Sequence, residues 1–351
     1  MPLPDPQSAL LSTFIRTFIT ASHILHHHAV LDAYGHLSFR HPSNTSTFFM
    51  SRNTAPATVS SPEDVIEYRV SDASPIDPSA PQGYAERHIH SEIYKRHPSV
   101  TAAVHSHSEA VVPFTVSGVP LRPVYHMAGF LPADGAPVFE IGEHYGEAEE
   151  EARDMLVKNE RLGAVLAREF DGGVAVVLMR GQGFTVVAEE EGGMQEVVLR
   201  AVYTQKNAAI QSSAVMLRSA YEGAGGGWRA GEVRYLDEEE CKGATDVTRW
   251  SAQRPWKLWV REVEASGLYV NSSADKHSGF AASKSTKPTS CPFAHDEVML
   301  SDVSMLDSEL VKPALSLLTA VQAVRSGSPR ALHQVDDEAD HAPVFAFGEV
   351  A

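Results

Sequence analysis

The segment 83–107 predicts a helix followed directly by a buried strand, and this order constrains the fold more than any other feature. The helix covers 83–96 and ends before Pro98, because proline disfavours the helical conformation in the residue before it. Residues 100–105 form a short apolar run that ends in histidine, which is typical of a buried strand. A buried strand needs helices to cover it, so the segment predicts an α/β domain of two or three layers.

The rest of the hydrophobic pattern adds helices and strands around this segment. Apolar side chains at helical spacing predict helices, and short apolar runs bounded by turns predict strands. Helices are expected at 8–30, after Ser61, at 109–116, at 146–170 (acidic and amphipathic) and at 190–220. Strands or extended segments are expected at 36–41, 46–52, 123–130, 174–179 and 184–189.

Glu86, His90, His105 and His107 form the most specific chemical pattern in the chain. Residues two apart in a strand point to the same face, so the imidazoles of His105 and His107 can reach one point in space. Glu86 and His90 are four apart in the predicted helix and therefore share a face. Two neutral nitrogen ligands beside a carboxylate can hold a divalent metal next to a general acid/base.

Composition argues against several classes of protein and partner. The formal net charge of −16 disfavours nucleic acid or an anionic membrane as a partner, because phosphate backbones require a basic face. No apolar run approaches the ~20 residues that a bilayer requires, and the N-terminus lacks the pattern of a signal peptide. Only two cysteines occur, Cys241 and Cys291, which excludes a disulfide framework. We therefore expect a cytoplasmic protein in a reducing compartment.

Three parts of the chain differ in composition. Residues 1–222 carry the regular helix and strand pattern. Residues 223–270 begin with a glycine-rich stretch and are rich in aromatic side chains, which are expected to pack on the first part or on a neighbouring subunit. Residues 271–351 have low complexity and weak periodicity, and they predict a largely disordered tail.

The spacing of Glu86, His90, His105 and His107 resembles the signature of the class II aldolase/adducin family. In that family a later apolar strand ends in His-Gly, and the histidine completes the metal site. The resemblance covers roughly residues 8–220.

Two shorter segments add to the resemblance. Gly35, His36 and Ser38 resemble the early Gly-Asn-hydrophobic-Ser turn of the family, which makes them candidates for substrate binding. The region 254–256 (Arg-Pro-Trp) resembles an extension seen in some fungal members.

The resemblance implies a three-layer α/β fold with a central, mainly antiparallel sheet flanked by helices. It also implies a homotetramer with its sites at subunit interfaces, and a small-molecule substrate. Active members bind a divalent metal, most often zinc, that polarises a carbonyl and stabilises an enediolate.

The chain departs from the family at the third metal ligand. The strand that should end in His-Gly has Gln182 before its glycine. An amide oxygen is a weaker and harder ligand than an imidazole, so zinc affinity should fall and Mn, Fe, Co or Ni become possible. His126 is an alternative ligand for this position. The resemblance thus indicates a fungal-type member with an altered third metal ligand.

Two further departures concern the substrate. Phosphate-handling members have small hydroxyl residues before the glutamate, where this chain has Tyr84 and Ala85, and their Thr/Ser-Gly loop is replaced by 51–54. Both differences disfavour a phosphorylated sugar. Aldolase members carry a tyrosine directly after the histidine that His126 matches. Here Tyr125 precedes that histidine, so a phenolic proton donor at this position has poor geometry.

These observations favour a metal-dependent lyase that forms an enolate from a small unphosphorylated hydroxy- or keto-compound by retro-aldol cleavage, decarboxylation, dehydration or isomerisation. The alternatives are a non-catalytic adducin-like scaffold and a metal-free enolising enzyme of a biosynthetic pathway. The expected roles are catalytic for Glu86, His90 and Tyr125, and metal-binding for His105, His107, Gln182 and His126.

Overall fold

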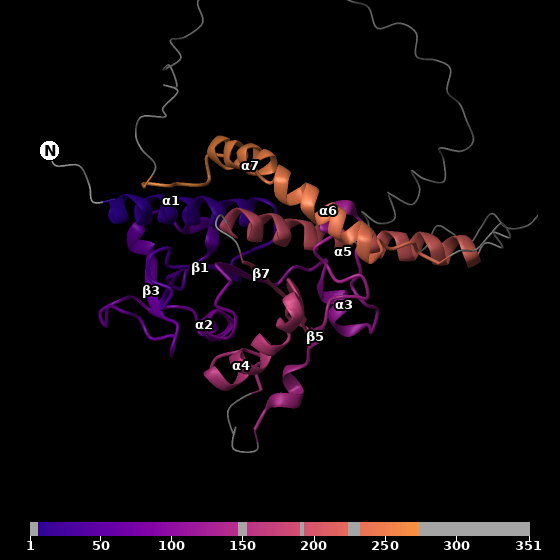
Figure 1. The fold of residues 1–351 in the computed structure, drawn as a ribbon, viewed down its shortest axis with the longest axis horizontal. Helices are drawn as coiled ribbons and strands as arrows, with labels where there is room; N and C mark the ends of the chain where they lie inside the picture. The colour runs from indigo at the N-terminus through magenta and orange to yellow at the C-terminus, as the bar shows by residue number, and fades with distance from the viewer. Residues whose placement is uncertain (1–5, 147–152, 190–192, 224–231, 274–351) are drawn as a thin grey trace, which may run out of the picture. The chain divides into compact units, whose positions relative to one another are not determined.

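A single mixed sheet forms the centre of the protein. The computed structural model describes residues 6–146, 153–189, 193–223 and 232–273 (Figure 1). Its seven strands are β1 (His36–Arg40), β2 (Thr47–Ser51), β3 (Val65–Arg69), β4 (Ala102–Ser106), β5 (Val138–Phe139), β6 (Val176–Met179) and β7 (Gly183–Ala188).

The strand order is β3-β2-β1-β4-β7-β6-β5, and every neighbouring pair is antiparallel except β5 and β6. The expected mainly antiparallel sheet is therefore confirmed. Strand β4 lies in the middle between β1 and β7 and is buried along its whole length. A buried central strand accepts only apolar side chains or polar ones with partners, which makes its histidine informative.

Helices cover both faces of the sheet, which gives the expected three layers (Figure 1). One hydrophobic core joins the sheet to α1 and α5, and it contains Val104, Val176 and Val186. A second core joins the other face to α2 and α4, and it contains Val177 and Val187. Neighbouring residues of one strand thus enter different cores, as the two-residue alternation of a strand requires.

The helices are α1 (Pro6–His27), α2 (Arg87–Arg96), α3 (Val112–Val116), α4 (Glu160–Arg168), α5 (Gly193–Gly223), α6 (Glu238–Ser251) and α7 (Gln253–Ala265). Most agree with the sequence pattern, but the single helix predicted over 146–170 is wrong. Helix α4 begins only after Asn159, whose side chain caps it by accepting the N–H of Leu162. Residues 153–158 are not helical, and the Val157 N–H donates to Glu86 instead.

Two other local predictions are corrected by the structure. The extended segment expected at 123–130 contains a 3-10 turn, η3 (His126–Ala128), because the Ala128 N–H donates to the carbonyl of Tyr125. The helix expected after Ser61 is only the 3-10 turn η2 (Pro62–Asp64), which leads into β3.

Helix α1 is long and apolar enough, by length and composition, to cross a membrane over Gln7–His27. The expectation that no run approaches this length is therefore wrong for α1. In the structure its side chains Phe18, Ile24 and Leu25 are fully buried in the core shared with β1 and α5. The apolar character of α1 is thus explained by packing on the sheet.

The aromatic-rich part folds into helices α6 and α7. Helix α6 packs on η3, and α7 lies along α1, where Trp259 and Val263 enter the first core (Figure 1). After α7 the chain comes back to α1, where the Asn271 amide donates to the carbonyl of Arg16. The tail predicted for 271–351 lies outside the described residues from 274 onward.

Candidate active site

Three neighbouring strands place His36, His105 and Thr185 side by side. His36 of β1 pairs with His105 of β4, and His105 pairs with Thr185 of β7. In each strand the neighbouring residues belong to the core on the α1 side of the sheet. The side chains of His36, His105 and Thr185 therefore point to the opposite face, toward α2. The register of three strands therefore builds the floor of a polar site on an otherwise apolar face.

The histidine pair converges as its spacing predicts. The Nε2 atoms of His105 and His107 lie 3.0 Å apart. The Nδ1 of His105 lies 3.1 Å from the Thr185 hydroxyl, which itself donates to the sulfur of Met179. Because the single hydroxyl proton of Thr185 is used there, Nδ1 of His105 is the donor and its Nε2 keeps a free lone pair.

Glu86 lies at the start of α2 and is held by one carboxylate oxygen. Its Oε1 accepts hydrogen bonds from the Val157 N–H at 3.1 Å and from the Gln182 amide at 3.0 Å. Its Oε2 lies 3.9 Å from Nε2 of His36 and 3.9 Å from Nε2 of His105. The free oxygen is therefore the one that faces the histidines.

The protonation states suit a cation ligand set. Burial lowers the pKa of His105 to about 3, although the Glu86 carboxylate acts in the opposite direction. Burial by itself raises the pKa of Glu86, but its contacts with His36, His105 and Val157 bring the pKa below its usual value. Because His105 is neutral at neutral pH, we attribute the ionised state of Glu86 to hydrogen bonds rather than to a nearby full positive charge.

A divalent metal fits this cluster. The donor atoms of Glu86, His105 and His107 all lie within 4.8 Å of one another. Bonds of about 2.0–2.2 Å to nitrogen and oxygen would place tetrahedral ligand atoms roughly 3.3 Å apart, so small side-chain shifts complete the geometry. Glu86, predicted as the acid/base, can thus also contribute a ligand oxygen.

Gln182 lies in the site, but its described contact is with Glu86 rather than with a histidine. Its position is set by Gly183, whose φ of +132° is unfavourable for other residues. A Cβ atom on Gly183 would lie 2.1 Å from the carbonyl oxygen of Ser106. The glycine lets β7 turn closely against the end of β4. Whether Gln182 binds a metal stays a prediction.

His90 contacts His36 and Ser38 rather than Glu86. Its Nε2 lies 2.7 Å from Nδ1 of His36, and its Nδ1 lies 2.6 Å from the Ser38 hydroxyl. That hydroxyl lies 2.7 Å from the hydroxyl of Tyr94. Sequence reasoning missed Tyr94, although it follows His90 by four residues on α2 and therefore shares its face.

Gly35 supports the approach of β1 to β4. Its φ is +77°, and a Cβ atom there would lie 2.8 Å from the carbonyl oxygen of His105. The substrate-binding roles expected for Gly35, His36 and Ser38 stay predictions. The structure places His36 at the cluster itself, and its Nε2 is buried without a hydrogen-bond partner.

Tyr125 and His126 lie on a different part of the chain. The rings of these two residues contact each other, and Tyr125 also packs against Tyr203 of α5. His126 is exposed, on a turn that packs against α5 and α6. Within the described residues of this one chain, no contact joins them to the histidine cluster. Their catalytic and metal roles stay predictions.

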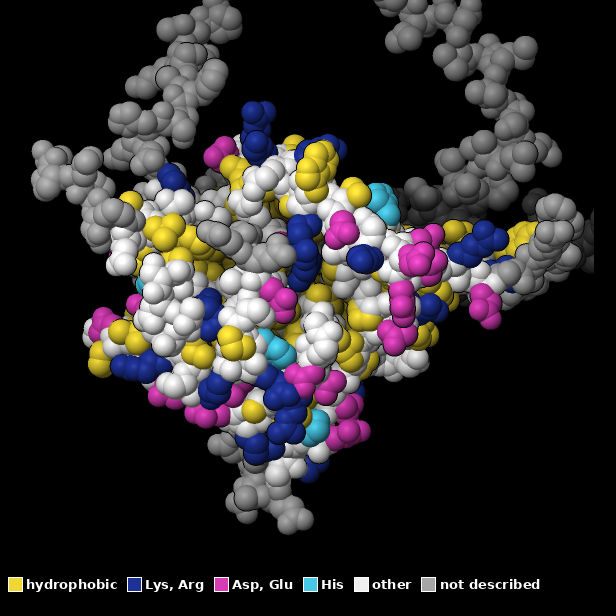
Figure 2. All heavy atoms as spheres, in the orientation of Figure 1, with side chains coloured by type: hydrophobic (Ala, Val, Ile, Leu, Met, Phe, Trp, Pro, Cys, Tyr) yellow, Lys and Arg dark blue, Asp and Glu magenta, His cyan; other side chains and the backbone are white. Residues whose placement is uncertain are grey.

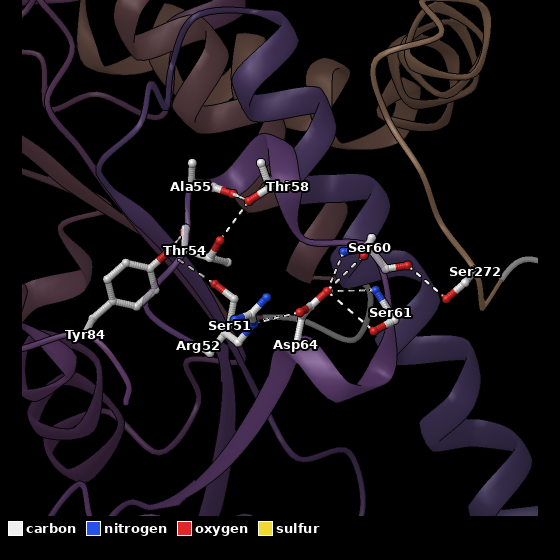
Figure 3. Close-up of polar contacts among 10 residues, drawn as sticks. All are labelled: Ser51, Arg52, Thr54, Ala55, Thr58, Ser60, Ser61, Asp64, Tyr84 and Ser272. Carbon is white, nitrogen blue, oxygen red and sulfur yellow. Dashed lines mark hydrogen bonds and ion pairs between the residues drawn. The ribbon is translucent and has the colours of Figure 1, made fainter. Parts of the chain in front are cut away.

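The loop 51–54 is occupied by contacts within the protein. The Tyr84 hydroxyl donates to the carbonyl of Thr54 and lies 3.3 Å from the Ser51 hydroxyl (Figure 3). The Arg52 side chain donates to Asp64 at 2.8 Å. The ring of Tyr84 also lies 4.8 Å, centroid to centroid, from that of His36, so this loop borders the site.

An open hollow of about 560 Å³ gives access beside His107. It is also lined by Asp32, Ser108, Glu109 and Gln205. His105 is fully buried, whereas His107 is only partly buried, so the hollow reaches the cluster at its His107 end.

Residues 16–212, more than half of the chain, match the family described as Class II Aldolase and Adducin N-terminal domain. This match contains the whole cluster around Glu86, His105 and His107. It ends before α6 and α7, so these helices lie outside the part that the family shares.

The chain is also similar in sequence to decarboxylases. The chain is 49% identical over 264 residues to Decarboxylase tropJ of Talaromyces stipitatus, covering 73% of this chain and 96% of that protein. It is 31% identical over 118 residues to a 3,4-dihydroxyphthalate decarboxylase of Arthrobacter keyseri, covering 32% of this chain and 41% of that protein.

Solved structures share the fold. L-fuculose 1-phosphate aldolase from Glaciozyma antarctica PI12 superposes with a TM-score of 0.53 at 16% identity, covering 75% of this chain and 93% of that one. At this identity the likeness concerns the three-layer architecture alone.

Proposed function

The chain belongs to the class II aldolase/adducin family as an aldolase-like lyase, and we propose that it is a metal-dependent decarboxylase. The substrate we propose is a small, unphosphorylated acid with a hydroxyl or carbonyl group near the carboxylate that leaves. The observation that carries the proposal is the convergence of Glu86, His105 and His107 on one point at the end of β4. The 49% identity to a decarboxylase favours loss of CO2 over the other enolate-forming reactions.

The proposed reaction breaks one C–C bond and consumes one proton. The carboxylate leaves as CO2, its bonding electron pair stays on the substrate carbon, and a proton then adds to that carbon. A divalent metal held by His105 and His107, with Glu86 beside it, would stabilise the negative charge on the adjacent substrate oxygen.

Glu86 is the residue we propose to move the proton. Its Oε2 accepts a proton from the substrate hydroxyl and returns it to the carbon that has lost CO2. Solvent then restores the proton of the hydroxyl. The Val157 N–H and the Gln182 amide keep Oε1 fixed, so the same oxygen performs both transfers.

The loop 51–54 supports an unphosphorylated substrate. The hydroxyl of Ser51 and the carbonyl of Thr54 contact Tyr84, and Arg52 pairs with Asp64 (Figure 3). These groups would have to give up internal partners before they could bind a phosphate. A planar acid, such as a hydroxylated benzoate, places no such demand on the loop.

The test combines metal content with CO2 release. The full chain is loaded in turn with Zn, Mn, Fe, Co and Ni, and CO2 is measured from 3,4-dihydroxyphthalate and related hydroxy acids. We expect about one metal per chain, and its loss together with activity in His105→Ala. The matched control is His27→Ala, an exposed histidine at the end of α1 that should change neither.

Three outcomes would contradict the proposal. Turnover that survives chelation favours a metal-free enolising enzyme. A folded chain with neither metal nor turnover favours an adducin-like scaffold. Loss of metal in His126→Ala, with retention in His107→Ala, would show that the metal site is built around His126 instead.

We also propose a cytoplasmic location, which cell fractionation tests, and a homotetramer, which light scattering tests.

A further inference from the structure

A chain of four buried polar residues leads from the second core to Glu86. It runs from the Tyr94 hydroxyl to the Ser38 hydroxyl at 2.7 Å, to Nδ1 of His90 at 2.6 Å, and from Nε2 of His90 to Nδ1 of His36 at 2.7 Å. Each of the four side chains is at most 3% exposed. The chain ends at Nε2 of His36, the buried atom without a partner, 3.9 Å from Oε2 of Glu86.

Two proton orders use the Ser38 proton within this chain; in any other order that buried proton would have no acceptor among the described residues. A hydroxyl and a neutral imidazole each supply one proton, so each link needs one donor and one acceptor. Burial and the neighbouring His36 and His105 keep the pKa of His90 well below its usual value, so His90 is neutral. Either every residue donates toward Glu86, or every residue donates toward Tyr94.

The Tyr94 hydroxyl decides between the two orders. Its one described hydrogen-bond partner is Ser38, and the second core surrounds its ring. If Tyr94 accepted from Ser38, its own proton would have no acceptor among the described residues, which is unfavourable for a buried hydroxyl. Donation by Tyr94 gives the protons of Tyr94, Ser38 and His90 an acceptor each. It leaves the last proton on Nε2 of His36, 3.9 Å from Oε2 of Glu86, where the negative carboxylate favours an N–H over a lone pair.

We propose that Tyr94, Ser38 and His90 are positioning residues that hold His36 in the tautomer with its proton on Nε2. That N–H points at Oε2 of Glu86 and at the substrate atoms that bind beside it. His36 then acts as a hydrogen-bond donor to developing negative charge and not as a metal ligand. The effect on catalysis rests on the proposed function, whereas the tautomer itself does not.

The test deletes the last hydroxyl of the chain. Tyr94→Phe removes the group that selects the order, so the two tautomers of His36 should mix. We expect the 15N shifts of the imidazole to move from one tautomer toward the average. We also expect kcat to fall about 10- to 100-fold with KM within about twofold, as is typical for supporting partners of site residues. Ser38→Ala should behave alike, and the double variant should lose little more.

The matched control is Tyr68→Phe. Tyr68 is a buried tyrosine of the same core, on β3, and lies outside the hydrogen-bonded chain. It should leave both the 15N shifts and kcat unchanged. Ser38→Thr keeps a hydroxyl and should retain most of the activity.

Two results would overturn the inference: an unprotonated Nε2 of His36 in the parent protein, or 15N shifts that Tyr94→Phe does not move. Both are read without substrate. Failure of the proposed function is therefore distinguishable, because it would appear as absent CO2 release with the His36 tautomer intact.

Discussion

Each histidine of the site is defined by the partner of its other ring nitrogen. Thr185 accepts from Nδ1 of His105 and so directs the Nε2 lone pair toward His107. His36 is instead supported by His90. An imidazole offers a lone pair or a proton on a given nitrogen depending on this partner, so two adjacent histidines can perform opposite tasks.

Thr185→Val should therefore weaken metal binding without removing a ligand. Valine has nearly the same shape but cannot accept the Nδ1 proton of His105. We expect metal affinity to fall about 10- to 100-fold, measured by competition with a chromophoric chelator. Thr204→Val is the control, because the hydroxyl of Thr204 bonds within α5 and it should leave affinity unchanged. Equal affinities in the two variants would contradict the assigned role of Thr185.

Gly183→Ala should destabilise the fold by roughly 3 kcal/mol, because strained backbone and a steric clash act together. The clash is with the Ser106 carbonyl, 2.1 Å from the added Cβ. Gly172→Ala is the control, since its φ is +77° with no heavy atom within 4 Å, and it should cost only about 1 kcal/mol. Urea unfolding measures both, and similar costs would show that contact with β4 is unimportant.

At the scale of elements, the register of β1, β4 and β7 brings residues far apart in sequence into one row. Helix α2, which packs on this face of the sheet, contributes His90 and Tyr94 to the site. The non-helical segment before α4 contributes the Val157 N–H. The connection from β2 to β3 supports this arrangement. There the Asp64 carboxylate accepts hydrogen bonds from the backbone of Ser60 and Ser61 (Figure 3).

Asp64 should make the free energy of unfolding depend on pH. Burial by itself raises the pKa of Asp64, but hydrogen bonds from Ser60 and Arg52 bring it below its usual value. Because the pKa of Asp64 is lower in the folded than in the unfolded protein, the ionised carboxylate stabilises the fold at pH values above its unfolded-state pKa of about 3.9. This stabilisation is lost as the pH falls through the folded-state pKa. Asp64→Asn should thus cost stability at pH 7 and approach the parent below pH 4. Thermal unfolding across pH measures this, and a pH-independent difference would contradict it.

At the scale of the whole molecule, helix α5 extends beyond the sheet and carries exposed apolar side chains (Figures 1 and 2). Met216, Leu217 and Tyr221 are 65%, 72% and 51% exposed. Neighbouring exposed apolar side chains are typical of surfaces that another protein covers. The homotetramer implied by the family resemblance would supply such a cover.

Leu217→Glu should therefore lower the oligomeric state, because a buried charge without a partner destabilises an interface. Light scattering should give a tetramer for the parent and a smaller species for the variant. Val116→Glu, a similar change at an exposed position of α3, is the control and should remain a tetramer. A tetramer in both variants would place the interface elsewhere, and a monomeric parent would remove the basis of the prediction.

Much of the fold and part of the site could be predicted from the sequence. The alternation of apolar residues and the His-x-His spacing are local, and they correctly placed β4, α2 and the convergence of His105 with His107. The pattern failed over 146–170, where helical spacing was overridden because the Val157 N–H bonds to Glu86. That hydrogen bond joins residues 71 positions apart, so no local pattern reports it.

The sequence by itself thus determined the family, the three layers and the ligand types at the end of β4, because periodicity and spacing act over a few residues. Only the tertiary structure decided which groups surround those ligands. Thr185 lies in the site because of strand register, and Tyr94 because of helix docking. Within the described residues of one chain, Tyr125 and His126 lie at η3, away from the histidine cluster. Long-range packing sets these distances, since buried polar groups must find their partners across the sheet.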